Sequence, residues 1–255
     1  MKTMARAVLK RRWTGILAYR KLRHTVLIAR VNLLAKWEGS VVHWDLAPDL
    51  QLGRGIRVKV WPRTETTVRI GPKSRIGDNV LLHLRGGTLN AGLRTDIRAH
   101  CSVQFEGNLT LEGENTISYG CVLHCGESVR LGYAAIMAEY SSIADSTHFH
   151  TTADYPIGEN VKFEPIEIGR NTFLCPRVSV NRGVTIGPWT VVGPSSVVAR
   201  DIPAGVFASG VPAKVVRSLG HPWMEDVLNN APGAPDPETP AWRKHADDGT
   251  QDFGA

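Results

Sequence analysis

Residues 143–150 read Ile-Ala-Asp-Ser-Thr-His-Phe-His and place an aspartate three residues before one histidine and five before another. A neutral imidazole can take a proton from a hydroxyl near pH 7, and a neighbouring carboxylate can fix its tautomer. Asp145, His148 and His150 are therefore candidates for general-base chemistry. With His124, the two histidines could instead ligate zinc. An isolated Asp-x-x-His pair is common in surface loops, so its meaning depends on the backbone that carries it.

The surrounding chain follows a six-residue repeat. After residue 167 an aliphatic residue occupies every sixth position, often followed by glycine: Ile168, Leu174, Val180, Ile186, Val192 and Val198. A six-residue period fits neither an amphipathic helix nor an alternating strand. It predicts a solenoid in which each hexad forms one short strand and a turn, and three hexads close one triangular coil. The repeats span roughly residues 50–205, with an extra loop at about 145–166 that carries the candidate histidines.

Spacings of 20 residues in the upstream repeats indicate coils of three hexads with two extra residues at a corner. Cys101 and Cys121 are 20 residues apart, at equivalent small, inward positions, and we expect them to stack in the core. Four cysteines in 255 residues do not make a disulfide scaffold, so a reduced, cytoplasmic setting is expected. The N-terminus has no signal-peptide pattern, and no apolar stretch is long enough to span a membrane.

Residues 165–217 resemble the C-terminal half of the hexapeptide-repeat, acetyl-CoA-dependent O-acetyltransferases of the maltose and galactoside acetyltransferase group. Four pieces carry the resemblance in order and spacing: Pro165–Gly169, Gly183–Gly187, Ser196–Pro203 and Gly210–Lys214. The period predicts a mainly β fold, and the resemblance implies that this solenoid is a left-handed parallel β-helix. The residue pattern of the two ends predicts an N-terminal helical segment and a short C-terminal helix or tail. The resemblance also implies a homotrimer with active sites between subunits, and acetyl-CoA or another short acyl-CoA as co-substrate, with no metal.

The resemblance also assigns roles to individual positions. His148 matches the family's catalytic histidine, and Asp145 is its candidate partner or an acceptor-site residue. The cofactor-binding positions carried over are Pro176, Gly193, Pro194, Ala199, Arg200, Lys214 and Arg217. Ser118, which stands where some relatives have asparagine, is a candidate acceptor-binding residue. Phe173 could provide an apolar wall near the acceptor, and His150, which has no role carried over from the family, is a further candidate for acceptor binding.

The expected reaction is transfer of an acyl group, most simply acetyl, to a hydroxyl of a sugar, polysaccharide or related glycan. Two alternatives remain open. The chain could be a non-catalytic β-helix scaffold that binds glycan or membrane. It could also be a metal-dependent enzyme like the γ-class carbonic anhydrases, using the histidines at 124, 148 and 150.

Charge is distributed unevenly along the chain. Residues 1–36 contain ten Lys or Arg and no Asp or Glu, whereas the rest carries 20 basic and 24 acidic residues. The charge of residues 37–255 therefore does not indicate a nucleic-acid-binding surface. We expect residues 1–45 to form a basic amphipathic helical segment, 46–217 the β-helix acyltransferase domain, and 218–255 an acidic, Pro-rich, partly disordered tail. The segment 1–36 either caps the solenoid or makes peripheral contact with the inner face of the membrane; both uses remain open.

Overall fold

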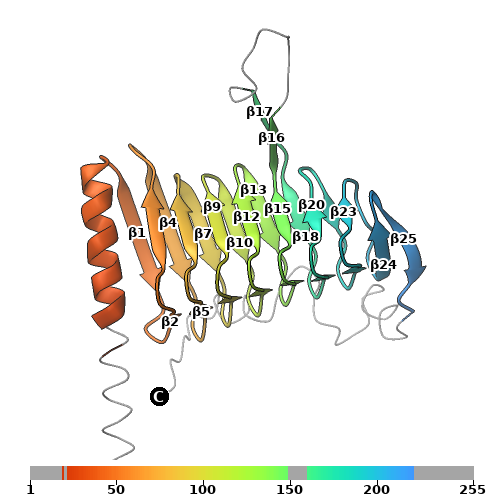
Figure 1. The fold of residues 1–255 in the computed structure, drawn as a ribbon, viewed down its shortest axis with the longest axis horizontal. Helices are drawn as coiled ribbons and strands as arrows, with labels where there is room; N and C mark the ends of the chain where they lie inside the picture. Colours follow the sequence, from red (N-terminus) through yellow and green to blue (C-terminus); the bar gives the residue numbers. More distant parts are fainter. Residues whose placement is uncertain (1–18, 20–21, 149–159, 221–255) are drawn as a thin grey trace, which may run out of the picture.

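The computed structural model describes residues 19, 22–148 and 160–220. Short strands stack into three parallel sheets, here called sheets A, B and C, and the chain visits them in turn as it winds along one axis (Figure 1). The predicted fold class, a mainly β left-handed parallel β-helix with an N-terminal helical segment, is confirmed. The expected C-terminal helix falls in 221–255, outside the described residues.

Each sheet takes one strand from each coil. Sheet A contains β1 (Val41–Leu46), β4 (Glu65–Ile70), β7 (Gly87–Ala91), β10 (Asn108–Leu111), β13 (Ser128–Leu131), β18 (Ile166–Ile168) and β21 (Thr185–Ile186). Sheet B contains β2 (Gln51–Leu52), β5 (Arg75–Ile76), β8 (Asp96–Ile97), β11 (Thr116–Ile117), β14 (Ile136–Met137), β19 (Phe173–Leu174), β22 (Val191–Val192), β24 (Val206–Gly210) and β25 (Ala213–Ser218). Sheet C contains β3 (Arg57–Val60), β6 (Leu81–Leu84), β9 (Ser102–Phe105), β12 (Val122–Cys125), β15 (Ser142–Ala144), β20 (Ser179–Val180) and β23 (Val197–Val198).

The aliphatic residues of the hexads fill the interior of the prism. In the central coils, residues 20 positions apart stack directly, as Leu109 does on Val129 and Leu89. These side chains are completely buried, and each contributes roughly 1.5–3 kcal/mol relative to an exposed position. Cys101 and Cys121 are buried on neighbouring coils, as their spacing predicts. The hexad pattern therefore specifies the core directly.

The two ends of the β-helix are closed differently. A helix at 22–37 lies across the first coil and buries Val31 and Ala35 in the core (Figure 1). At the other end, β24 and β25 pair antiparallel, which ends the parallel winding. Because it buries Val31 and Ala35, the N-terminal helix caps the solenoid with one of its faces. None of the helical residues that the structure describes forms a segment long and apolar enough to cross a membrane.

The β-helix begins with β1 at Val41, before the predicted boundary at residue 46. Its regular winding is interrupted after β15. Between β15 and β18 the chain leaves the prism as an antiparallel ribbon of β16 (Ser146–His148) and β17 (Val161–Phe163), which projects from one edge in Figure 1. The described ends of the predicted loop at 145–166 are thus paired strands.

Candidate active site

His148 stands at the end of β16, on the ribbon that projects from the β-helix. In the ribbon His148 pairs with Val161, and Ser146 pairs with Phe163 at its base. The imidazole is exposed to solvent. The frame of the repeat explains this position, since Ile143 is the last buried aliphatic residue before the chain leaves the prism. His150, the second histidine of the segment, lies outside the described residues.

Asp145 anchors the base of this ribbon. It is completely buried, and its carboxylate accepts hydrogen bonds from the backbone N–H groups of Gly126 (2.7 Å), Glu127 (2.8 Å) and Ser128 (2.9 Å). Its carbonyl accepts a further bond from the N–H of Glu164, on the returning chain (2.9 Å). These contacts hold the ribbon to the preceding coil. A role for Asp145 as the partner of His148 remains a prediction.

A glycine makes room for the ribbon's aromatic contact. Gly126 lies under the ring of Phe163, and a Cβ placed on it would fall 2.0 Å from the ring atom Cε1. That separation is far inside van der Waals contact, so a side chain at this position must displace the ring. The position of Phe163, and with it the base of the ribbon, therefore depends on glycine at 126.

His124 lies on β12, which pairs with β15, the strand from which the ribbon of His148 leaves. It belongs to a column on the outer face of sheet C, where Gln104, His124 and Ala144 are register partners. Its Nε2 lies 2.9 Å from Nε2 of Gln104. Burial lowers the pKa of His124, and the charge of His148 acts in the same direction. The sequence signal for this column is the spacing of residues 104, 124 and 144, which equals the 20-residue period of the core positions.

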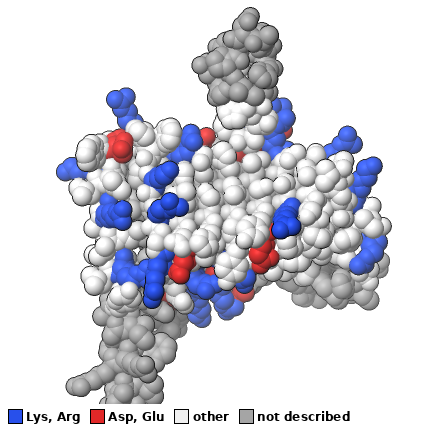
Figure 2. Space-filling model, in the orientation of Figure 1, with Lys and Arg blue, Asp and Glu red and all other residues white. Residues whose placement is uncertain are grey.

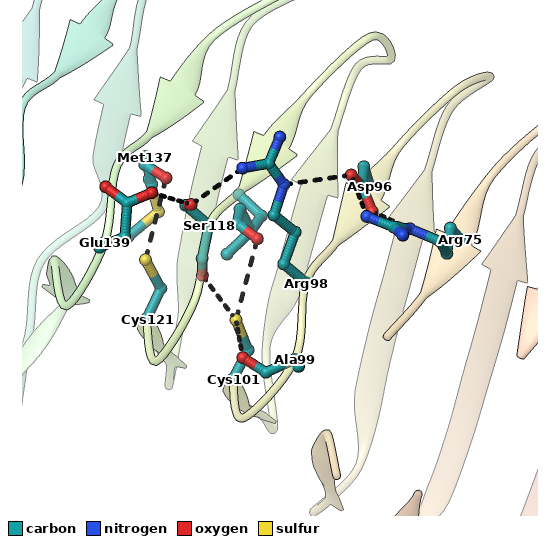
Figure 3. Close-up of polar contacts among 10 residues, drawn as sticks. Arg75, Asp96, Arg98, Ala99, Cys101, Ser118, Cys121, Met137 and Glu139 are labelled. Carbon is teal, nitrogen blue, oxygen red and sulfur yellow. Dashed lines mark hydrogen bonds and ion pairs between the residues drawn. The ribbon is translucent and has the colours of Figure 1, made fainter. Parts of the chain in front are cut away.

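Ser118 belongs to a polar ladder along a different corner of the prism (Figure 3). Its hydroxyl donates to Glu139 (2.7 Å) and accepts from Arg98 (3.3 Å), while Arg98 also contacts Asp96. These bonds lower the pKa of Glu139, chiefly through the bond from Ser118. The ladder follows the corner where the chain passes from sheet B to sheet C. It lies at the start of the sheet C strands, whereas His148 follows the end of one such strand.

The predicted donor-binding positions near residues 176 and 194 lie at that same B-to-C corner. Pro176 precedes β20, and its carbonyl accepts the N–H of Ser195 from the next coil (3.0 Å). Gly193 packs tightly, since a Cβ on it would fall 2.7 Å from the hydroxyl of Ser209. Pro194 is the residue between Gly193 and Ser195 in the chain. This part of the predicted donor site is therefore built from backbone, with little room for side chains.

Other predicted donor and acceptor residues lie on sheet B. Phe173 pairs with Val191, which in turn pairs with Phe207, so these three outward side chains form an apolar row. The guanidinium of Arg217 lies over the ring of Phe207, 5.7 Å from its centroid. Lys214 is on the same hairpin strand, β25. This face could therefore bind a long anionic ligand with an apolar arm, since the apolar row can contact the arm and the two cations can pair with the anionic groups.

Within one chain the predicted site is divided. Ala199 and Arg200 follow β23 at the end of the sheet C strands, on the edge from which the ribbon of His148 also leaves. The corner at Pro176 and the sheet B row with Phe173 lie beyond the opposite end of those strands. The fold thus does not bring His148 together with most of the predicted donor-binding residues of the same chain.

A separate cleft of about 350 Å³ opens on the sheet A side. Arg130, Tyr133 and Arg170 line it, and Gly132 and Gly169 are among its other lining residues. Arg130 is paired with carboxylates within 2.6 Å and 2.8 Å, which neutralise its charge. None of the predicted site residues lines this cleft, so we do not place the reaction there.

The described residues also bear on the zinc alternative. No group of three His, Cys, Asp or Glu side chains among residues 22–148 and 160–220 is arranged to hold a metal ion. His150, which a zinc set would need, lies outside those ranges.

Comparison with known proteins adds family information. The family model described as bacterial transferase hexapeptide (six repeats) matches residues 165–200. A probable acetyltransferase of Mycobacterium tuberculosis is 30% identical over 71% of this chain and 53% of its own length. The galactoside O-acetyltransferase of Escherichia coli is 32% identical over 44% of this chain and 62% of its own length. The chain therefore spans less than two thirds of these two relatives.

Two further proteins are similar over more of their length. A putative colanic acid biosynthesis acetyltransferase of Escherichia coli is 28% identical over 65% of this chain and 88% of its own. The solved structure of a polysialic acid O-acetyltransferase is 19% identical, covers 75% of this chain and 96% of its own, and superposes with a TM-score of 0.49.

Proposed function

We propose that this chain, a hexapeptide-repeat protein with named acetyltransferases among its relatives, is a CoA-dependent O-acyltransferase that acts on a sugar or glycan hydroxyl. The observation that carries the proposal is the placement of His148. The ribbon presents this imidazole to solvent directly before the coils that match the transferase model. The glycan acceptor is proposed from the names of two relatives, a galactoside O-acetyltransferase and a putative colanic acid biosynthesis acetyltransferase.

In the proposed reaction His148 acts as the general base. Its neutral imidazole takes the proton of the acceptor hydroxyl as that oxygen attacks the thioester carbonyl. The tetrahedral intermediate collapses to the ester, and the CoA thiolate leaves. The imidazolium then returns the proton to the thiolate. An exposed imidazole on a two-stranded ribbon is accessible to both substrates, and such proton transfer contributes typically 10²–10⁴-fold to the rate.

The residues available for acyl-CoA fit its chemistry. The apolar row that includes Phe173 can accommodate the pantetheine arm and the acyl group. Arg217 and Lys214 can pair with phosphate oxygens. Arg200 lies at the other edge of sheet C and can reach the phosphates only if the ligand, or a second subunit, spans that face. Acetyl-CoA is the simplest donor, and propionyl-CoA or succinyl-CoA would meet the same groups.

A homotrimer would complete the divided site. His148 and the sheet B residues of one chain lie beyond opposite ends of the sheet C strands. In the proposed trimer, neighbouring chains therefore supply the two halves of each site. A closed ring of three chains repeats one heterologous interface three times and therefore forms three such sites. The four cysteines are unpaired, and three of them are buried, which is consistent with a reducing, cytoplasmic setting for this trimer.

The test is release of CoA from acetyl-, propionyl- and succinyl-CoA with a panel of sugars and glycans. We expect His148→Ala to lower turnover by about 10²–10⁴-fold while the unfolding transition stays unchanged. His43→Ala, which removes an exposed histidine on β1, is the matched control and should retain full turnover. Near-normal turnover by His148→Ala would overturn the assignment. Binding of CoA without turnover of any acceptor would favour the non-catalytic scaffold.

A further inference from the structure

The N-terminal helix presents a row of apolar side chains to solvent. Leu22, Val26, Leu33 and Trp37 are separated by four or seven positions, which places them along one side of the helix. Leu33 is 71% exposed and Trp37 is 88% exposed. Single exposed apolar residues are ordinary, but an aligned row on one helix face marks an interaction surface.

The opposite face of the helix packs against the first coil of the β-helix. Val31 and Ala35 are buried against the first coil, and the ring of His24 bonds the carbonyl of Leu50 at 2.8 Å. Arg23 donates to the carbonyl of Leu52 at 2.6 Å, so this cation belongs to the cap. The helix is therefore held in one orientation, and the outer row is not needed to close the solenoid.

The charge around the row indicates what covers it. Arg30 and Lys36 are exposed and lie one turn from members of the row. The segment 1–36 contains ten Lys or Arg and no Asp or Glu. Figure 2 shows further basic side chains, and few acidic ones, toward the N-terminal end of the face in view. Bringing several copies together through this segment would oppose like charges, whereas an anionic surface would complement them.

We propose that the outer face of the helix at 22–37 docks on an anionic phospholipid surface. Leu33 and Trp37 enter the boundary between headgroups and acyl chains, and Arg30 and Lys36 pair with lipid phosphates. The helix lies on the bilayer without crossing it, with the β-helix held on its cytoplasmic side. This inference is independent of the proposed acyl transfer, because the helix face contains none of the residues assigned to that reaction.

The test is cosedimentation of the full-length protein with vesicles of phosphatidylcholine containing phosphatidylglycerol, and with pure phosphatidylcholine vesicles. We expect binding only to the anionic vesicles, weakening as salt rises. Leu33→Ser/Trp37→Ser should weaken binding by about tenfold or more, since both inserted side chains are lost. Trp61→Ser, at an exposed tryptophan after β3, is the apolar control and should bind as the unmodified protein does.

Charge is tested separately. Arg30→Ala/Lys36→Ala should weaken binding to anionic vesicles, and Arg57→Ala/Lys59→Ala, two exposed cations on β3, should not. Equal binding to both vesicle types, or unchanged binding by Leu33→Ser/Trp37→Ser, would refute the proposal. A lower assembly mass of Leu33→Ser/Trp37→Ser in light scattering, with no vesicle binding by either protein, would show instead that a second copy covers the row. The milder Leu33→Gln replaces the double variant if the latter fails to fold.

Discussion

The carboxylate of Asp145 accepts a hydrogen bond from the backbone N–H of Gly126 at 2.7 Å, although the two residues are 19 positions apart. The same carboxylate bonds the next two N–H groups, so one buried side chain satisfies three backbone donors. This arrangement couples the base of the ribbon that bears His148 to the turn of the preceding coil. The position of the candidate base is therefore set by coil stacking as well as by local sequence.

Asp145→Asn is expected to reduce the free energy of unfolding by about 2–3 kcal/mol, because charge-assisted bonds weaken and an amide NH₂ faces backbone donors. Urea unfolding measures this change. Asp201→Asn is the control, because Asp201 is exposed and accepts a single bond, from the N–H of Thr185. Unchanged stability of Asp145→Asn, with turnover lost, would show instead that Asp145 takes part in the reaction.

Gly126→Ala is expected to lower kcat/KM by roughly tenfold to a hundredfold. The added methyl group displaces the ring of Phe163, and this displacement moves the ribbon and with it His148. Steady-state kinetics with acyl-CoA and an active acceptor measure the effect. The double variant Gly126→Ala/Phe163→Ala removes the clash and should recover part of the lost kcat/KM. If Gly126→Ala behaves as the unmodified protein does, the ribbon is not positioned by this contact.

Mixed assemblies test whether neighbouring chains share a site. We expect His148→Ala and Lys214→Glu/Arg217→Glu each to be nearly inactive alone. Coexpressed, they should regain about one quarter of the full activity, because that fraction of interfaces in a random trimer combines an intact base with an intact donor site. Turnover of the coexpressed, purified mixture provides the measurement. No recovery in a mixture shown by mass to contain both chains would place each site within a single chain.

The hexad pattern predicted most of the fold because one buried aliphatic residue per six is a local and repeated requirement. Ile168 and Val180 are buried as expected, and Ile143 correctly marks the exit of the ribbon. The hairpin of β24 and β25 was not predicted, since the hexads stop before it and nothing periodic remains to indicate pairing.

The candidate site was less predictable, because its contacts join residues from different coils. The spacing of Asp145 and His148 suggested a direct pair, yet the described bonds of Asp145 go to a turn that is about one coil away in sequence. Ser118 was singled out by resemblance, and the structure reveals its ladder with Arg98 and Glu139. These bonds join residues 17 to 21 positions apart, so the 20-residue period predicts which coils are neighbours but not which side chains bond between them.

The pH dependence of stability is the last prediction. Burial lowers the pKa of His124 below its usual 6.5, with Arg85 and His148 acting in the same direction and Asp145 and Glu106 opposing them. Between the normal and the lowered pKa the unfolded chain binds a proton that the folded chain does not. The contribution of neutral His124 to the free energy of unfolding is therefore fully present above the normal pKa, and it is lost as the pH falls toward the lowered pKa.

We expect the free energy of unfolding in urea to fall as the pH drops below about 6.5, and His124→Gln to reduce that fall. Glutamine can still bond Gln104 but cannot take up the proton. Burial also lowers the pKa of His83, so part of the pH dependence should persist in the variant. His43→Gln, at an exposed site on β1, should leave the fall unchanged. An equal fall in His124→Gln and the unmodified protein would mean that His124 is not buried in its neutral form, and that the column beside His148 differs from the one described.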